Sequence, residues 1–156
     1  MPRCRALSLA ALALGVVIGS VSIASAAPSS TAQTLTLIAV DDPKREVYID
    51  AGAKGEGPGD VLIFSELLHR RSARGEAVGR SEIVCIVVSR AGFRCEGTLL
   101  LPAGRLEAGG FVAFGNTPRF SVAILGGTRS YAGARGELVI TSLGERRDRY
   151  VIRLLA

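Results

Sequence analysis

Between Gly59 and Thr141, short stretches of alternating apolar and polar residues are separated by turns rich in glycine and proline. Proline fixes φ and glycine frees it, so segments such as Pro102-Ala103-Gly104 are typical of turns between strands. Many short strands at even spacing predict an all-β domain, either a barrel or a sandwich, and the 19 glycines fit a strongly coiled sheet. The strand patterns cover residues 34–40, 45–50, 61–68, 77–89, 93–101, 105–114, 120–125, 137–142 and 150–155.

The N-terminus has the pattern of a secretory signal peptide. Arg3 and Arg5 precede an apolar stretch over residues 7–18, and Ala24-Ser25-Ala26 supplies the small residues of a cleavage site. Glycines and serines interrupt the stretch, which falls short of the roughly 20 apolar residues that a membrane span needs. We therefore expect cleavage after Ala26, no stable membrane insertion, and a secreted, periplasmic or cell-surface protein. The expected organisation is a signal peptide over 1–26, a short linker over 27–33 and one domain over 34–156.

The basic residues do not indicate a nucleic-acid partner. The formal net charge is +5, and removal of Arg3 and Arg5 with the signal leaves 17 basic and 14 acidic residues, a net charge of +3. The remaining arginines cluster near residues 70–80 and 146–149. Such clusters can bind phosphates, but export, the nearly balanced charge and the lack of interleaved aromatic residues argue against that role. We interpret the clusters as solvated loops.

Two cysteines, Cys85 and Cys95, remain in the expected mature chain. They fall in one predicted hairpin, with strands over 81–89 and 93–101 and a turn through Arg90-Ala91-Gly92. A turn centred near Arg90 places the two cysteines opposite each other. Because an exported protein meets an oxidising compartment, this arrangement predicts a cross-strand disulfide. The alternative is a pair of reduced thiols packed in the sheet.

Four segments resemble, in order, the motifs of a known family. Gly59-Asp60-Val61-Leu62-Ile63-Phe64-Ser65 resembles the G-D-L-x-x-F-S strand of plant allene oxide cyclases. Val78-Gly79-Arg80 and the strand with Cys85 resemble the V-G-x-x-x-G-x-C segment that follows in those enzymes. Residues 123–128, with Tyr131 and Ala134-Arg135-Gly136, are similar to the G-G-T-G-x-F/Y-x-x-A-R-G run shared by dirigent proteins and bacterial cyclase-like proteins. The ordered set covers residues 59–142.

The resemblance implies a closed antiparallel eight-stranded β-barrel with an apolar interior, often assembled as a trimer. We therefore expect a homotrimer or homodimer. A barrel of about eight strands is filled by side chains or holds one small ligand. The cyclases carry an acid and an amide in the first strand, whereas residues 35–40 here hold neither. The dirigent pattern places an aspartate at the end of that strand, which is where Asp41 falls.

Asp41 and Glu66 are the candidate catalytic residues, because buried carboxyl groups acquire raised pKa values and move protons. Asp41 has an alternative role in a strand-end turn before Pro43. Glu66 follows the F-S pair, where the cyclases have an amide, and faces the same way as the apolar residues of its strand; the alternative is an ion pair with an arginine. His69, followed by two arginines, is expected in a surface loop. No metal site and no cofactor-binding motif is expected, and the glycines at 126, 127, 133 and 136 are interpreted as turn residues.

The leading functional hypothesis is a barrel that binds a small apolar or aromatic molecule and isomerises it, cyclises it or guides its stereochemistry, without a cofactor. The competing hypothesis is a non-catalytic secreted protein, either a carrier of lipids or metabolites or a structural module of the cell surface.

Overall fold

The computed structural model describes residues 32–52, 54–70, 72–115 and 118–155. The expected signal peptide and the linker up to residue 31 lie outside the described residues. Within the described part, none of the helices has the length and apolar character needed to cross a membrane.

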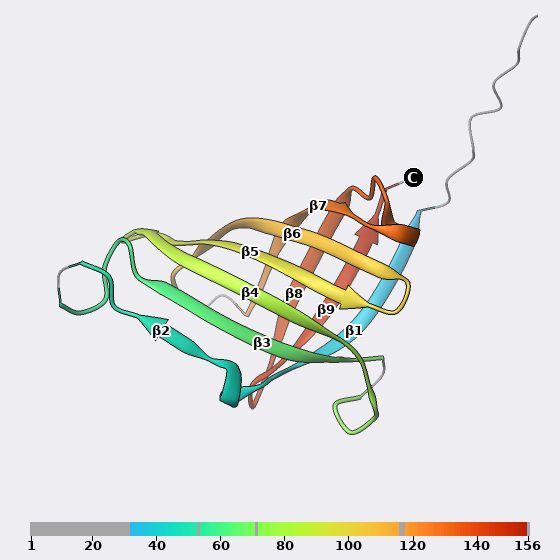
Figure 1. Ribbon diagram of the computed structural model, residues 1–156, viewed down its shortest axis with the longest axis horizontal. Coiled ribbons are helices and arrows are strands. Elements are labelled where there is room, and N and C mark those ends of the chain that lie inside the picture. The colour runs from blue at the N-terminus through green and yellow to red at the C-terminus, as the bar shows by residue number, and fades with distance from the viewer. Residues whose placement is uncertain (1–31, 53, 71, 116–117, 156) are drawn as a thin grey trace, which may run out of the picture.

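The described chain forms one antiparallel sheet that closes on itself (Figure 1). The strands are β1 (Gln33–Asp41), β2 (Val47–Ile49), β3 (Val61–His69), β4 (Ala77–Ser89), β5 (Gly92–Leu101), β6 (Gly104–Ala113), β7 (Arg119–Gly127), β8 (Gly136–Gly144) and β9 (Arg147–Leu154). Two short 3-10 helices, η1 (Pro43–Arg45) and η2 (Arg129–Tyr131), follow β1 and β7. The strands pair in the order β1-β9-β8-β7-β6-β5-β4-β3-β2, and β1 also pairs with β3.

The pairing of β1 with β3 closes a ring of eight strands, β1 and β3–β9, as the sequence predicted. It runs from Ile38 opposite His69 to Asp41 opposite Glu66. On its other side β1 pairs along its length with β9, from Gln33 opposite Leu154 to Val40 opposite Arg147. Each strand alternates inward and outward side chains, so one apolar set per strand faces the interior.

The strand expected over residues 45–50 is shorter and is not part of the ring. Asp42 caps η1, its carboxylate accepting a hydrogen bond from the Lys44 amide at 3.2 Å, and Pro43 starts the turn. Only Val47–Ile49 is extended. It pairs with Val61–Ile63, on the part of the β3 edge that lies beyond the end of β1. β1 and β2 therefore share one edge of β3, because the chain turns away at Asp42 before resuming an extended course.

One end of the barrel is filled by the core. Its largest fully buried apolar side chains, Leu68, Leu99, Leu106 and Ile152, come from four different strands. Tyr131 of η2 packs against this cluster and is also buried. Gly104 permits the close approach of η2, because its φ is +146° and a Cβ there would collide with the carbonyl of Thr128. A shallow hollow of about 370 Å³, lined by Leu35, Val78, Leu101 and Tyr131 among others, lies at this packed end.

Candidate functional site

A cavity of about 220 Å³ lies inside the barrel, next to the packed end. Its walls are inward side chains, and Phe64, Phe93 and Phe120 supply three aromatic rings. These phenylalanines are partly exposed. The volume is slightly below the roughly 300–1,000 Å³ typical of pockets for drug-sized ligands. The cavity therefore suits a small, mostly apolar molecule.

Three polar side chains form the floor of this cavity. Glu66 is 2% exposed and Ser81 is fully buried, and the two residues pair across β3 and β4. Ser81 Oγ donates a hydrogen bond to Glu66 Oε2 at 2.5 Å. The hydroxyl of Tyr150, from β9, donates to the same oxygen. Glu66 Oε1 makes no hydrogen bond with the described residues, so it is the oxygen left for a ligand.

Burial raises the pKa of the Glu66 carboxyl to about 7, although the hydrogen bonds from Ser81 and Tyr150 lower it. The nearby carboxylates of Asp148 and Asp41 add to the increase. Burial, followed by the charge of Glu66, keeps the pKa of Tyr150 well above its ordinary value. Near neutral pH, Glu66 is thus present in both protonation states while Tyr150 remains a hydrogen-bond donor.

The barrel wall is lower on the side of β1 and β9, which brings Glu66 close to its rim. β1 ends at Asp41, opposite Glu66, whereas β3 continues as far as Val61. Figure 1 shows β3–β6 extending beyond β8 and β9 at this end. A second hollow of about 290 Å³ opens at the low rim and is lined by Asp41, Glu46, Glu66, Arg146 and Asp148, among others. Glu66 and Asp148 line both hollows.

Arg146 bridges the acidic groups of the low rim. Its Nη2 lies 2.5 Å from a carboxylate oxygen of Glu46, and its Nε lies 3.2 Å from Asp41. Arg146 and Glu145 form the turn between β8 and β9, with φ angles of 60° and 52°. Left-handed conformations are uncommon for residues other than glycine and are concentrated at functional sites. This turn holds the arginine over the rim.

The carboxyl groups of Asp41 and Asp148 also have raised pKa values. For Asp41, burial raises the pKa, the Arg146 guanidinium opposes the increase, and Glu46 adds to it. For Asp148, burial is the main cause and the charge of Asp41 adds to it. Glu66, Asp41 and Asp148 therefore bring three carboxyl groups with raised pKa values together at the low-rim hollow.

At the higher side of the rim, Asp60 precedes the first residue of β3 and is 1% exposed. Its carboxylate accepts hydrogen bonds from the Tyr48 hydroxyl at 2.6 Å and from the amides of Ala51 and Gly57 at 2.9 and 2.7 Å. These bonds lower the pKa of Asp60, and the hydrogen bond to Asp60 raises the pKa of Tyr48 to about 12. They fix the described part of the loop between β2 and β3 beside the open end.

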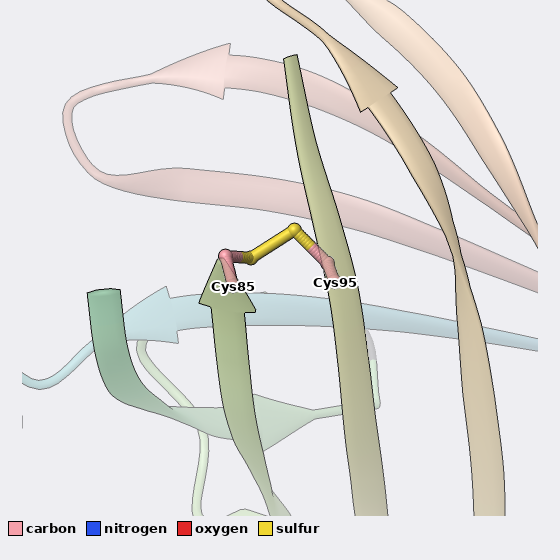
Figure 2. The surroundings of a disulfide bond; sticks show 2 residues. All are labelled: Cys85 and Cys95. Atoms are coloured by element: carbon pink, nitrogen blue, oxygen red, sulfur yellow. A yellow bond between two sulfur atoms is a disulfide. The ribbon is translucent and has the colours of Figure 1, made fainter. Parts of the chain in front are cut away.

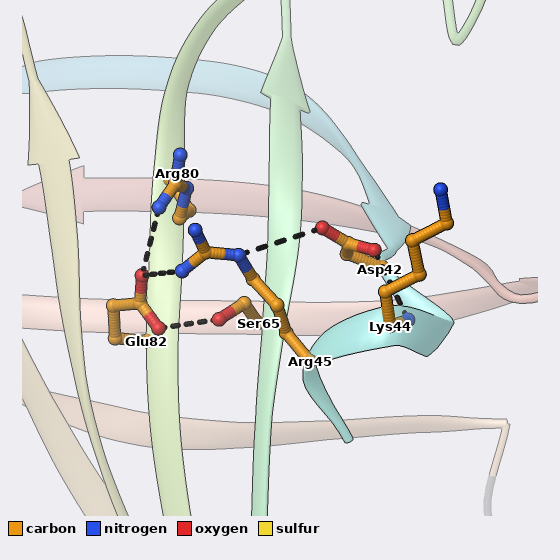
Figure 3. Close-up of polar contacts among 6 residues, drawn as sticks. All are labelled: Asp42, Lys44, Arg45, Ser65, Arg80 and Glu82. Carbon is orange, nitrogen blue, oxygen red and sulfur yellow. Dashed lines mark hydrogen bonds and ion pairs between the residues drawn. The ribbon is translucent and has the colours of Figure 1, made fainter.

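On the outer surface, a polar cluster fastens η1 to the barrel wall (Figure 3). Glu82 of β4 accepts a hydrogen bond from Ser65 and lies 3.3 Å from Arg80 and 3.8 Å from Arg45. Arg45 also lies 3.7 Å from Asp42. None of these groups lines the interior cavity, although Asp42 and Ser65 line the low-rim hollow, and we assign the cluster a structural role.

The structure brings the two predicted catalytic residues together. Asp41 and Glu66 are directly paired across β1 and β3, and both line the low-rim hollow. Cys85 and Cys95 are also directly paired, across β4 and β5, with a Cα–Cα distance of 4.0 Å and a disulfide between them (Figure 2). The disulfide lies in the cavity wall.

Sequence reasoning missed Ser81, Asp148 and Tyr150. Asp148 belongs to β9, which begins at Arg147 rather than at residue 150 as expected. The alternation Asp148, Tyr150, Ile152 was a signal that could have identified its inward face. The expectation for His69 was wrong: it is 6% exposed at the end of β3, and its Nδ1 lies 2.8 Å from the Gly75 carbonyl oxygen. The strand continues one residue further than the neighbouring arginines suggested.

Comparison with known proteins places this barrel in a family. No protein-family model and no curated protein matches the sequence. A pyocyanin demethylase structure is 30% identical, with a TM-score of 0.68, and the match covers 79% of this chain and 100% of that one. The fold is shared with a pterocarpan synthase dirigent protein (18% identity, TM-score 0.65, 80% of this chain and 87% of that one). It is also shared with an exo-specific intermolecular Diels-Alderase (14% identity, TM-score 0.62, 80% and 98%). With its closed ring of eight antiparallel strands, the chain belongs to the family of allene oxide cyclase and dirigent-like barrels.

Proposed function

We propose that this protein is an exported isomerase or cyclase that binds a small apolar or aromatic molecule inside the barrel, with Glu66 transferring a proton. The observation that carries the proposal is a buried carboxyl group, with one free oxygen, at the floor of an apolar cavity. Barrels of the same fold include a dirigent protein and a Diels-Alderase, which supports a role in guiding or closing a flexible reactant.

The proposed chemistry needs no group beyond the side chains of the floor. Ser81 and Tyr150 hold Glu66 Oε2, which leaves Oε1 to face the bound molecule. In its ionised form Glu66 takes a proton from a ligand carbon next to a carbonyl group, and it returns that proton to a second atom. The products are the isomer and the regenerated carboxylate, so protons and electrons balance. A pKa of about 7 suits both halves of this exchange.

The apolar walls contribute through shape. A reactant held in one folded conformation between the rings of Phe64, Phe93 and Phe120 has lost most of the freedom that opposes ring closure. Stereochemical guidance follows from the same confinement, because only one face of the reactant is then open to attack. Cyclisation therefore requires the cavity, and isomerisation requires the cavity together with Glu66.

The experiment begins with native mass spectrometry of the protein purified from its own host, to identify a retained small molecule. Conversion of that molecule is then compared between the wild type, Glu66→Gln and the matched outer-surface variant Glu137→Gln. We expect Glu66→Gln to retain binding and to lose at least about 100-fold in rate, because proton transfer is removed. Glu137→Gln should behave as the wild type.

Two results would contradict the proposal. If Glu66→Gln converts the molecule at the wild-type rate, Glu66 is not the proton carrier. If the wild type binds the molecule but returns it unchanged, the protein is a carrier rather than an enzyme. Export is tested on the same sample, where the intact mass should correspond to a chain that begins at Ala27.

A further inference from the structure

We infer that the outer face of the barrel over β7, β8 and β9 binds a linear acidic polysaccharide, a polymer that carries carboxylate groups along its length. The inference concerns the outside of the barrel and goes beyond the proposed function, which concerns the interior. It is carried by the excess of arginine on this face, by the arrangement of the arginines along β9 and by the incomplete pairing of their guanidinium groups.

Alternation along the three strands shows which side chains form the outer face. On β9, Tyr150 and Ile152 are buried in the core, so the residues on either side of them point outward. Arg149 of β9 lies opposite Thr141 of β8, which in turn lies opposite Arg119 of β7 (Figure 1). The charged residues that this alternation places on the outer face are four arginines and one glutamate, namely Arg119, Arg147, Arg149, Arg153 and Glu137. The arginines of β9 therefore belong to a strand rather than to a solvated loop.

Three of these arginines follow one strand. Arg147, Arg149 and Arg153 lie about 7 and 14 Å apart along β9, given a rise of about 3.4 Å per residue. Arg119 lies two strands away from β9, about 10 Å to the side at the usual spacing of neighbouring strands. The positive charges are thus spread over roughly 20 Å instead of converging on one point. This arrangement suits a chain of anionic groups better than a single small anion.

Two of the arginines have no acidic partner, and a third is held only weakly. Arg119 and Arg149 are exposed and form no ion pair with the described residues. Arg153 lies 3.2 Å from Glu137, with the two side chains 52% and 46% exposed. An ion pair this exposed to water contributes little, so its arginine can exchange one carboxylate for another. Because a guanidinium group donates two parallel hydrogen bonds to a carboxylate, a polymer of carboxylates is a suitable partner.

Arg147 is only partly satisfied by its own chain. Its Nη2 lies 2.6 Å from Glu145, a residue whose side chain is 83% exposed. Its Nε is buried without a hydrogen-bond partner, and it is the one side-chain nitrogen or oxygen in that condition among the described residues. A buried donor without an acceptor is unfavourable. Rotation of Arg147 from Glu145 towards a carboxylate bound on the outer face would give this nitrogen an acceptor.

The middle of the face favours a polysaccharide over a lipid bilayer. Between the arginines, the outward side chains are small or polar, and the two valines among them, Val139 and Val151, are buried and half-buried. Surfaces that bind bilayers combine basic residues with large apolar side chains that enter the acyl boundary. This part of the face supplies the charge without those side chains. The proposed export would bring the acidic polymers of a cell envelope within reach.

The basic face stays accessible when copies of the chain associate through the opposite wall. In the ring, β8 and β4 are separated by three strands on either side. A second copy seated on the exposed apolar residues of β4, Val84 and Ile86, therefore leaves the arginines pointing outward. Two or three linked faces would bind one long polymer more tightly than a single face does.

The test measures the binding of labelled polygalacturonate to the full mature protein by fluorescence anisotropy. Fully methyl-esterified polygalacturonate serves as the uncharged form of the same polymer. We expect the acidic polymer to bind and the esterified polymer not to bind. Raising the salt concentration from about 20 to about 200 mM should weaken binding, because exposed charges are then screened.

Two double variants with the same loss of charge locate the binding surface. Arg119→Gln combined with Arg149→Gln should weaken binding of the acidic polymer at least about tenfold, because two guanidinium–carboxylate contacts are lost. Arg74→Gln combined with Arg94→Gln removes two exposed arginines from other parts of the surface and should change the affinity by less than about twofold. Circular dichroism should show that both double variants are folded.

The outcomes separate this inference from the proposed function. Absence of binding, equal binding of the acidic and esterified polymers, or an equal loss in the two double variants overturns the inference. Tighter binding to phosphatidylglycerol vesicles than to polygalacturonate also overturns it and makes a membrane surface the partner. Since Arg119 and Arg149 point away from the cavity, their double variant should still bind a ligand inside the barrel, so each of these failures leaves the proposed function intact.

Discussion

At the scale of single residues, Glu66 should make the stability of the protein depend on pH. Its pKa is about 7 in the folded state, against 4.5 in the absence of burial, so the folded state holds more protons between these values. The contribution of Glu66 to the free energy of unfolding should therefore fall as the pH rises from about 4.5 to 7 and then level off. The shift corresponds to about 3 kcal/mol. Urea unfolding of wild type and Glu66→Gln across this range measures the contribution of Glu66 as a difference.

Glu66→Gln keeps an acceptor for Ser81 and Tyr150 but cannot ionise, so it should become more stable than the wild type as the pH rises. Asp41 and Asp148 remain in both proteins, which removes their own titration from the comparison. If the free energies of unfolding of the two proteins change in parallel with pH, the raised pKa of the buried Glu66 carboxyl is contradicted.

The sequence revealed Glu66 but not Asp148, and the difference has a local cause. Glu66 lies inside a regular strand, so simple alternation fixes its inward direction. Asp148 follows a turn of two left-handed residues, Glu145 and Arg146, where hairpins usually carry Asn-Gly. The dense charges around that turn resembled a solvated loop. The inward face of β9 became clear only from its pairing with β1 and β8.

At the scale of elements, the sequence predicted the strands of the ring and the pairing within the β4–β5 hairpin, but not the position of β2. Alternation and turn residues located every strand of the ring, because these are local properties. The role of β2 depends on where β1 leaves the edge of β3, which is decided by pairing over a long sequence separation. The Cys85–Cys95 pairing was predictable because the two strands are consecutive and the turn between them is short.

The hairpin of β4 and β5 should owe part of its stability to the disulfide. The bond closes a loop with a sequence separation of 10. On the chain-entropy model, such a loop stabilises the folded state by about 3 kcal/mol. Replacing both cysteines by alanine should lower the free energy of unfolding by about this amount, measured in urea. A reducing agent should destabilise the wild type and leave the double variant unaffected. A wild type that is insensitive to reduction would argue against the bond.

At the scale of the whole molecule, one outer face of the barrel is unusually apolar. Val47, Ile63 and Val84 lie directly across β2, β3 and β4, and Ile49, Val61 and Ile86 form the next row. Val84 and Ile86 are 41% and 42% exposed. Contiguous exposed apolar residues mark sites of association, and β2 adds a free strand edge beside them. We therefore expect a second copy of this chain to cover the β2–β4 face, in a homodimer or homotrimer.

Light scattering coupled to size-exclusion chromatography of the mature protein measures this directly. The wild type should elute with two or three times the mass of the chain, and Val84→Lys combined with Ile86→Lys should elute as a monomer, because burying two ammonium groups in an apolar interface is strongly unfavourable. Ser121→Lys, on the exposed outer face of β7, adds charge away from the β2–β4 face and should leave the assembly intact. A wild type that is monomeric at micromolar concentration would contradict the prediction that a second copy covers the β2–β4 face. Since the β2–β4 face and the cavity lie on opposite sides of β3 and β4, the monomeric variant should still bind a ligand inside the barrel.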